Sequence, residues 1–95
     1  MKLIGKKTLN GFKERHPDAR SQLESWEAEV EESQWETPHD LKNKYPKASI
    51  VGNHKVVFDI CGNKYRLLVE VSYKNRMVLI DKIGTHKEYD NWNIN

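Results

Sequence analysis

Hydrophobic residues in the first half of the chain recur at the spacing of an α-helix. The longest stripe has steps of four, three and four residues and consists of Ala19, Leu23, Trp26 and Val30. This spacing places the four side chains on one face of a helix and leaves the intervening glutamates facing water. Asp18 directly precedes the stripe and is the expected N-cap. The pattern therefore predicts one long amphipathic helix that starts after this aspartate.

Two shorter helices are predicted on either side of the long one. Leu9 and Phe12 lie three residues apart behind Thr8, which is an N-cap residue type. The run TPHD at residues 37–40 begins the other helix, because threonine suits the N-cap, proline the first helical position and aspartate the third. A following proline ends each of these helices.

The hydrophobic period changes to two in the second half, which is typical of half-buried strands. A first strand is predicted around residues 56–60. After a Gly-Asn turn at residues 62–63, a longer strand has one face formed by Tyr65, Leu67, Val69, Val71 and Tyr73. A second short turn leads to a third strand around residues 78–80 that ends near Gly84. The short connections predict an antiparallel meander, and residues 2–4 are a candidate edge strand.

Helices followed by strands are typical of an α+β fold, and 95 residues are expected to form one domain, residues 1–95. Hydrophobic residues make up 37% and charged residues 32%, which favours a folded, soluble protein. The sequence contains no apolar run of the roughly 18 residues that a membrane span needs. Residues 1–7 lack the apolar stretch of a secretion signal. Since the single cysteine, Cys61, cannot form an internal disulfide, we expect a cytoplasmic protein.

Charge is unevenly distributed along the chain. The formal net charge is only +2. Basic and acidic residues balance in the first half, where six glutamates fall between residues 24 and 36 without a lysine or arginine, so the positive excess lies in the second half. A surface that attracts phosphate is therefore expected in the second half. The acidic long helix also argues against a helix-turn-helix repressor, because binding to the DNA backbone depends on lysine and arginine.

Arg66 is the candidate for a phosphate-binding residue. In the longer strand it alternates with the apolar residues, on the face that also carries Leu68, Glu70 and Ser72. If the helices cover the apolar face, Arg66 points from the open side of the sheet into solvent. There its guanidinium could bind a phosphate through two parallel hydrogen bonds. The alternative is an ordinary surface arginine that pairs with Glu70.

Three more residues add chemistry near the ends of these strands. His86 and Tyr89 follow Gly84 in an expected loop, where side chains are free to act, and imidazole exchanges a proton near neutral pH. Lys64, beside the Gly-Asn turn, adds a second cation. Each has an alternative interpretation, because most lysines beside hairpins are only solvated and a single histidine is more often structural than catalytic. Together with Arg66, these residues form a set that suits the cleavage of RNA.

Metal and cofactor motifs do not occur in the sequence. Its four histidines and Cys61 show no HxxxH or CxxC spacing, and there is no P-loop or dinucleotide-binding glycine motif. We therefore expect a reaction without metal or cofactor. Trp26 and Trp35 are expected in the core, with Trp35 anchoring the linker before the third helix. Trp92, in the polar C-terminal segment, leaves three alternatives: packing back on the sheet, stacking a base or contacting a partner.

Two of these segments resemble the HigB-type toxins of the RelE superfamily: GNKYRL at residues 62–67 and GTHKEYD at residues 84–90. The resemblance extends to landmarks along the whole chain, including the run HPDA at residues 16–19 and the run WETP at residues 35–38. It implies a compact RelE-like fold, with N-terminal helices on one face of a largely antiparallel sheet of three to five strands. It also implies a type II toxin that cleaves mRNA on the ribosome and is silenced by a HigA-like antitoxin with a helix-turn-helix domain.

The resemblance also implies roles for individual residues. Arg66 corresponds by motif to the phosphate-binding arginine of the family, and His86 and Tyr89 fall in the segment that supplies the C-terminal catalytic residues. Lys64 precedes the shared arginine and is expected to add supporting charge. The residues expected to contact RNA around this set are Asn63, Lys82 and Lys87. Two departures leave the general base open: several relatives carry lysines where this chain has Asp59, and others have arginine near the position of His86.

The expected reaction is attack of an RNA 2′-hydroxyl on the neighbouring phosphorus, which needs a base, charge stabilisation at phosphorus and an acid for the leaving oxygen. His86 is expected as acid or base, Arg66 as the phosphate ligand, and Tyr89 as the residue that orients or stacks the nucleotide. A net charge of only +2 favours an enzyme that relies on the ribosome to present its message. The alternative is a non-catalytic RNA- or protein-binding module of the same fold.

Overall fold

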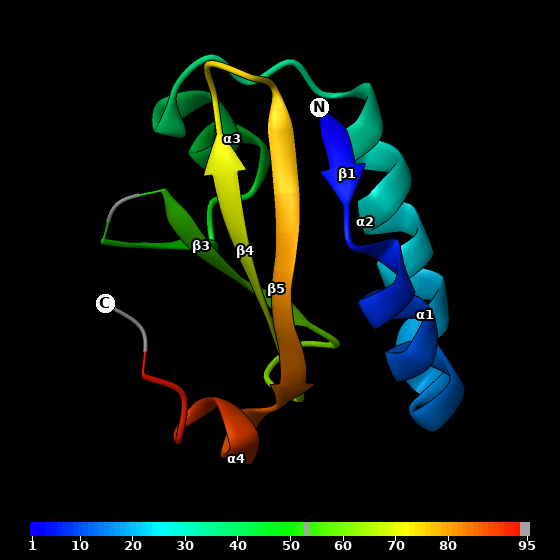
Figure 1. Ribbon diagram of the computed structural model, residues 1–95. Coiled ribbons are helices and arrows are strands. Elements are labelled where there is room, and N and C mark those ends of the chain that lie inside the picture. Colours follow the sequence, from blue (N-terminus) through cyan, green and yellow to red (C-terminus); the bar gives the residue numbers. More distant parts are fainter. Residues whose placement is uncertain (53, 94–95) are drawn as a thin grey trace.

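The structure is a computed structural model that describes residues 1–52 and 54–93 (Figure 1). The helical elements are α1 (Lys6–Arg15), a short 3-10 helix (Pro17–Ala19), α2 (Arg20–Glu32), α3 (Pro38–Lys44) and α4 (His86–Tyr89). The strands are β1 (Lys2–Ile4), β2 (Ser49–Val51), β3 (Lys55–Ile60), β4 (Tyr65–Ser72) and β5 (Met77–Thr85). This composition confirms the predicted α+β class.

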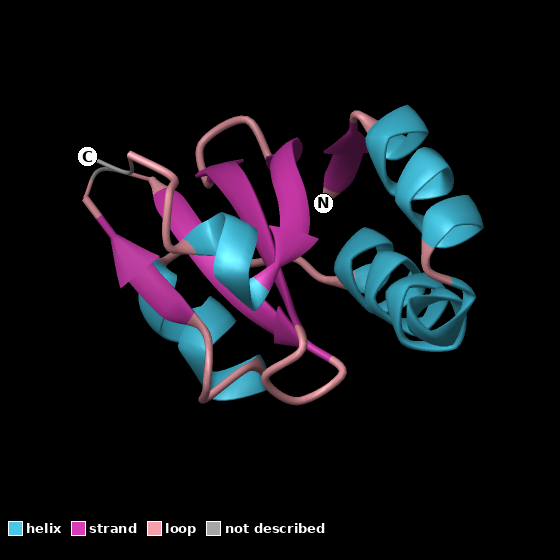
Figure 2. Cartoon of the chain, turned by 90° about the horizontal axis from the view of Figure 1, so that it is seen from below, coloured by secondary structure: helices cyan, strands magenta, loops and turns pink. Residues whose placement is uncertain are grey.

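The five strands form one sheet in the order β1-β5-β4-β3-β2. β3, β4 and β5 are the predicted antiparallel meander, and β1 is the predicted edge strand, paired parallel to β5. β2 adds a short antiparallel strand at the other edge that the hydrophobic pattern did not predict. In Figure 1, α1 and α2 run side by side next to β1, and α4 follows the far end of β5. Figure 2 looks onto the end that carries α4 and shows α3 apart from the α1–α2 pair.

The helix starts differ from those expected for the first two helices. α1 begins at Lys6, with Gly5 as a left-handed N-cap at φ 95°, so Thr8 lies inside the helix. A Cβ at residue 5 would lie 3.1 Å from Cβ of Ile80, so the close approach to β5 also requires glycine. A 3-10 turn precedes α2, and Asp18 is not its N-cap. The third start is as predicted, because Thr37 and the third helical residue form a reciprocal capping box.

The core lies between α2 and the face of the sheet that carries the alternating apolar residues. Trp26 packs edge-on against Phe58 with the ring centroids 5.3 Å apart, and Trp35 is 5% exposed, as predicted for both tryptophans. One glutamate of α2 contradicts the expectation that all of them face water. Glu27 is 8% exposed, and its carboxylate lies 2.6 Å from the ammonium of Lys13 in α1. This ion pair joins the two long helices beneath the surface.

The C-terminal end of the sheet also departs from the expected loop. β5 continues to Thr85, with a register irregularity opposite the Leu68–Val69 step of β4. His86 to Tyr89 then form α4 rather than a loop. The Thr85 hydroxyl accepts a hydrogen bond from the Glu88 backbone N–H (3.1 Å), and the Glu88 carboxylate accepts one from the Thr85 N–H (2.8 Å). This capping box fixes the direction in which α4 leaves the sheet.

Candidate active site

Arg66 lies on the face of the sheet opposite α1 and α2, as its place in the alternation predicted. The register sets Asp59 of β3 on one side of it and Gly84 of β5 on the other. Two expectations fail here. Arg66 is buried, at 8% exposure, rather than pointing freely into solvent, and its Nε lies 3.2 Å from the Asp59 carboxylate rather than pairing with Glu70. A guanidinium removed from water needs such a carboxylate partner.

The Nη1 and Nη2 groups of Arg66 donate to the hairpin turn that precedes β4 and to the first residue of β4. Nη1 donates to the carbonyl oxygens of Asn63 (3.1 Å) and Tyr65 (3.2 Å), and Nη2 donates to the Asn63 side-chain oxygen (3.3 Å). The guanidinium is therefore held by Asp59 on one edge and by Asn63 on the other. A phosphate that binds Arg66 has to replace some of the Asn63 contacts.

The shape of the turn explains why Asn63 reaches Arg66. Residues 61–64 connect β3 to β4, and both Cys61 (φ 55°) and Gly62 (φ 66°) are left-handed. Glycine is the residue that adopts this conformation without strain, so the Gly62-Asn63 sequence sets the path of the turn. Gln22 of α2 supports it from outside, because its side-chain oxygen accepts a hydrogen bond from the Cys61 backbone N–H at 2.7 Å.

Tyr89 covers Arg66 from the side of α4. The Arg66 Cζ lies 5.6 Å from the centroid of the Tyr89 ring, a distance at which the cation is attracted to the ring. The Tyr89 ring in turn meets Trp92 edge-on, with the centroids 5.6 Å apart. Trp92 packs back on the sheet over Gly84, where a Cβ would lie 3.1 Å from Cζ2 of the indole. Of the three alternatives for Trp92, the structure shows the first.

His86 lies on the exposed side of α4. Its backbone N–H donates to the carbonyl of Lys64 (3.1 Å), which ties the start of α4 to the start of β4. Its ring Nδ1 lies 3.7 Å from the carboxylate of Asp90, one turn further on. His86 thus lies in the same short helix as Tyr89, with its imidazole open to solvent.

Lys64 turns toward the helices and away from Arg66. Its ammonium pairs with the carboxylate of Asp18, which also accepts the Tyr65 hydroxyl at 2.9 Å. The hydrogen bond from Lys64 holds the pKa of Asp18 below its usual value, and the same bond raises the pKa of Lys64. His16 stacks on Phe12, and its ring Nδ1 lies 3.3 Å from the Tyr65 hydroxyl.

The three residues expected to contact RNA have different surroundings. Asn63 is in direct contact with Arg66. The Lys82 ammonium lies 6.0 Å from the centroid of the Trp92 ring, at the margin of the same face. Lys87 is exposed on α4. The structure therefore brings together Arg66, Asn63 and Tyr89, places Lys82 beside them, and separates Lys64.

Asp59 is the residue of this cluster to which the sequence reasoning gave no role, although a signal for it existed. Residues equally far from a hairpin turn oppose each other, so Ile60 faces Tyr65 and Asp59 faces Arg66. Counting outward from the Gly-Asn turn would have identified the ion pair.

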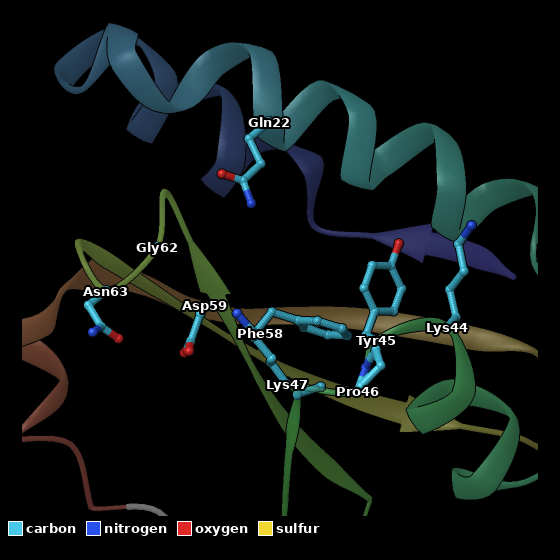
Figure 3. Close-up of a pocket in the computed structure, with 10 residues that line it drawn as sticks. Gln22, Lys44, Tyr45, Pro46, Lys47, Phe58, Asp59, Gly62 and Asn63 are labelled. Atoms are coloured by element: carbon cyan, nitrogen blue, oxygen red, sulfur yellow. The ribbon is translucent and has the colours of Figure 1, made fainter.

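A cavity of about 560 Å³ opens on the other side of Asp59 and Asn63 (Figure 3). Its walls come from α2, the segment between α3 and β2, the end of β3 and the hairpin turn. The lining residues are Gln22, Lys44, Tyr45, Pro46, Lys47, Ala48, Phe58, Asp59, Gly62 and Asn63. Nothing in the sequence pattern brings α2 and residues 44–48 together, so this cavity could not be predicted from the sequence.

Within residues 1–52 and 54–93, no group of three or more histidine, cysteine, aspartate or glutamate side chains is arranged to hold a metal ion. In the same part of the chain, no helix is both long and apolar enough to cross a membrane.

Comparison with known proteins gives consistent results along the chain. Residues 19–92 match the family described as HigB_toxin, the RelE-like toxic component of a toxin-antitoxin system. The mRNA interferase toxin HigB of Escherichia coli (strain K12) is 28% identical over 95 residues, which cover 95% of this chain and 88% of the relative. The mRNA interferase HigB of Escherichia coli O6:H1 is 24% identical over 92 residues, which cover 95% of this chain and 89% of the relative.

Proposed function

This chain belongs to the HigB toxin family, the RelE-like toxic components of toxin–antitoxin systems, and from this premise we propose that it is an mRNA interferase, an endoribonuclease that cuts messenger RNA on the ribosome. The observation that carries the proposal is the Arg66 cluster. A guanidinium lies on the sheet face opposite α1 and α2, between Asp59 and Asn63 and against the Tyr89 ring. Such a guanidinium is held in a fixed position and can bind a phosphate that displaces part of its contact with Asn63, and the adjacent aromatic ring suits a nucleotide base.

In the proposed reaction, the RNA 2′-oxygen forms a bond to the neighbouring phosphorus while the bond from phosphorus to the 5′-oxygen breaks. A base takes the 2′-hydroxyl proton and an acid gives a proton to the leaving 5′-oxygen, so the products are a 2′,3′-cyclic phosphate and a 5′-hydroxyl. Arg66 stabilises the charge on the phosphate oxygens once the phosphate displaces part of its contact with Asn63. No step in this scheme calls for a metal or cofactor.

His86 is proposed as the acid or base. Its imidazole is exposed, and the nearby Asp90 carboxylate can orient it. Tyr89 is proposed to stack or orient the nucleotide, with Asn63, Lys82 and Lys87 contacting the RNA around it. Lys64 can add supporting charge only if its ammonium leaves Asp18.

The proposed partners follow from the family and from the charge. A formal net charge of +2 gives the protein little long-range attraction for RNA, which supports a substrate presented by the ribosome. The proposed inhibitor is a HigA-like antitoxin with a helix-turn-helix domain, and the proposed location is the cytoplasm. The family itself requires an antitoxin but does not specify its fold.

The test is expression of the chain without an antitoxin in a bacterial host, compared with an Arg66→Ala variant. The parent should arrest growth and produce transcripts cut within coding sequence, as read by primer extension, and the variant should do neither. Normal growth with abundant folded protein and intact transcripts would instead support a non-catalytic binding module.

A second comparison tests dependence on the ribosome. Purified protein should cleave mRNA in a programmed 70S complex much faster than the same RNA free in solution. Chelation of metal by EDTA should leave the rate unchanged once the magnesium that the ribosome needs is controlled for. Equal rates on free and ribosome-bound RNA would identify an independent ribonuclease.

A further inference from the structure

The cavity beside the Arg66 cluster has a rigid wall formed by the segment between α3 and β2. The ammonium of Lys42 donates to the carbonyl oxygens of Pro46 (2.8 Å) and Ala48 (2.7 Å), which fixes the path of this segment. The Tyr45 hydroxyl donates to Glu29 of α2 (2.6 Å), and the Tyr45 ring meets Phe58 edge-on at 5.1 Å. The cavity is therefore already formed without a ligand.

The polar groups that line the cavity are mostly hydrogen-bond donors. The side-chain oxygens of Gln22 and Asn63 are occupied by the Cys61 backbone N–H and by Arg66, so each amide has its NH₂ group left to donate. Figure 3 shows Gln22 reaching from α2 toward the sheet, with Asn63 and Asp59 across from it.

Two lysines add positive charge at the same cavity. Lys44 and Lys47 are exposed, and their ammonium groups have no hydrogen-bond or ion-pair partner among residues 1–52 and 54–93. The carboxylate in the lining, that of Asp59, is already paired with Arg66. Two lysines without partners in the described part of the chain and two amide donors therefore line a space that suits an anionic ligand rich in acceptors.

We propose that this cavity binds a nucleotide of the RNA adjacent to the cleaved bond, with Lys44 and Lys47 contacting phosphate and the amides of Gln22 and Asn63 contacting the base. The proposal rests on the proposed function and extends it to the substrate. Asp59 and Asn63 line the cavity and also hold Arg66, so a nucleotide in the cavity has its neighbouring phosphate beside the guanidinium. The volume falls within the roughly 300–1,000 Å³ typical of small-ligand sites.

The binding test uses a short single-stranded RNA in which every 2′-hydroxyl is methylated, so that it cannot be cut. Its affinity is measured by fluorescence anisotropy for the parent, for the double variant Lys44→Gln/Lys47→Gln, and for Lys74→Gln. Lys74 is an exposed lysine in the turn after β4, at the opposite end of that strand from Asn63, and serves as the matched control.

The double variant should bind about tenfold more weakly, and the slope of log affinity against log salt should fall by about 1.4, because each of the two lost phosphate contacts removes roughly 0.7 from that slope. Lys74→Gln should stay within about twofold of the parent. Equal affinity of parent and double variant overturns the proposal, and so does a parent that fails to bind the RNA at millimolar concentration.

A second readout separates this proposal from the proposed enzyme function. Addition of the uncleavable RNA should shift the side-chain amide resonances of Gln22 and Asn63 in the NMR spectrum, whether or not the protein cleaves messages on ribosomes. If RNA binds through these residues but the mRNA on programmed ribosomes is not cleaved, the nuclease function is wrong and the nucleotide site is still supported. If the double variant instead binds RNA like the parent but binds the antitoxin more weakly, the cavity is a protein-docking site and the proposal is wrong.

Discussion

The carboxylate of Asp59 and the guanidinium of Arg66 meet on the open face of the sheet, with Oδ1 and Nε 3.2 Å apart. They oppose each other because each is the second strand residue counted outward from the hairpin turn, and the register pairs Asp59 directly with Arg66. The arginine side chain is 10% exposed and that of the aspartate 35%, so the ion pair is shielded on one side and open on the other. This arrangement makes Arg66 both a structural residue and the proposed phosphate ligand.

Arg66→Ala should therefore affect both activity and stability. We expect cleavage on programmed ribosomes to slow by about a hundredfold or more. The free energy of unfolding should fall by about 1–3 kcal/mol, because the change leaves the Asp59 carboxylate and the Asn63 acceptors unpaired. Single-turnover cleavage and urea denaturation measure the two effects. Unchanged stability would show that the contacts of Arg66 are formed only weakly in solution.

Asp59→Asn should loosen the guanidinium without removing it. We expect a double-mutant cycle with Arg66→Ala to give a coupling energy of about 1 kcal/mol in urea denaturation, since directly contacting residues do not act independently. Asp59→Asn should reduce the cleavage rate less than Arg66→Ala does. Additive effects on stability would mean that the ion pair contributes nothing measurable.

His86→Ala should cost much more activity than Tyr89→Phe. The phenylalanine keeps the ring that covers Arg66 and removes only the hydroxyl, whereas alanine removes the proposed acid or base. The comparison is made on programmed ribosomes under single-turnover conditions. A parental rate for His86→Ala would exclude it as the acid or base and make Lys64 and Lys82 the next residues to test. If Tyr89→Phe is instead inactive, the phenol takes part in proton transfer or charge stabilisation.

Gly84→Ala should disturb the packing of Glu88 and Trp92 against the sheet. A Cβ at residue 84 would lie 3.1 Å from both Trp92 and the Glu88 carboxylate, so α4 and the tryptophan have to shift. We expect reduced cleavage and a change in tryptophan fluorescence. The control is Gly11→Ala in α1, where the new Cβ meets only Arg15 at 3.6 Å and should stabilise the protein by about 0.4–1 kcal/mol. Parental cleavage by Gly84→Ala would show that the packing of Trp92 is not needed.

Acid should weaken the attachment of α4. The backbone hydrogen bond from Thr85 holds the pKa of Glu88 below its ordinary value of 4.5. A carboxylate whose pKa is lower in the folded than in the unfolded protein stabilises the fold. This contribution is fully present above pH 4.5 and is lost as the pH falls through the folded-state pKa. In the parent protein, the midpoint of urea denaturation should rise between about pH 3 and pH 5, and Glu88→Gln should make this rise smaller. Glu32→Gln, an exposed position at the end of α2, is the control and should leave that rise unchanged.

The sequence by itself predicted the elements whose patterns are local. The period of two predicted the β3-β4-β5 meander and placed Arg66 on the face opposite the core, because side chains alternate strictly along a strand. The capping box at Thr37 and the core positions of Trp26 and Trp35 were also predicted, since each depends on a few neighbouring residues or on hydrophobicity alone. The motifs at residues 62–67 and 84–90 together indicated the family.

The tertiary structure decided what depends on contacts between distant segments. It turned Lys64 toward Asp18, 46 residues earlier in the chain, and placed Tyr89 and Trp92 over the sheet, because α4 folds back from the end of β5. It also buried Arg66 between Asp59 and Asn63 and assembled the cavity from α2 and the segment before β2. Hydrophobic periodicity records only whether a side chain faces the core, so the sequence pattern could predict the face on which Arg66 lies, but not its burial or its partners.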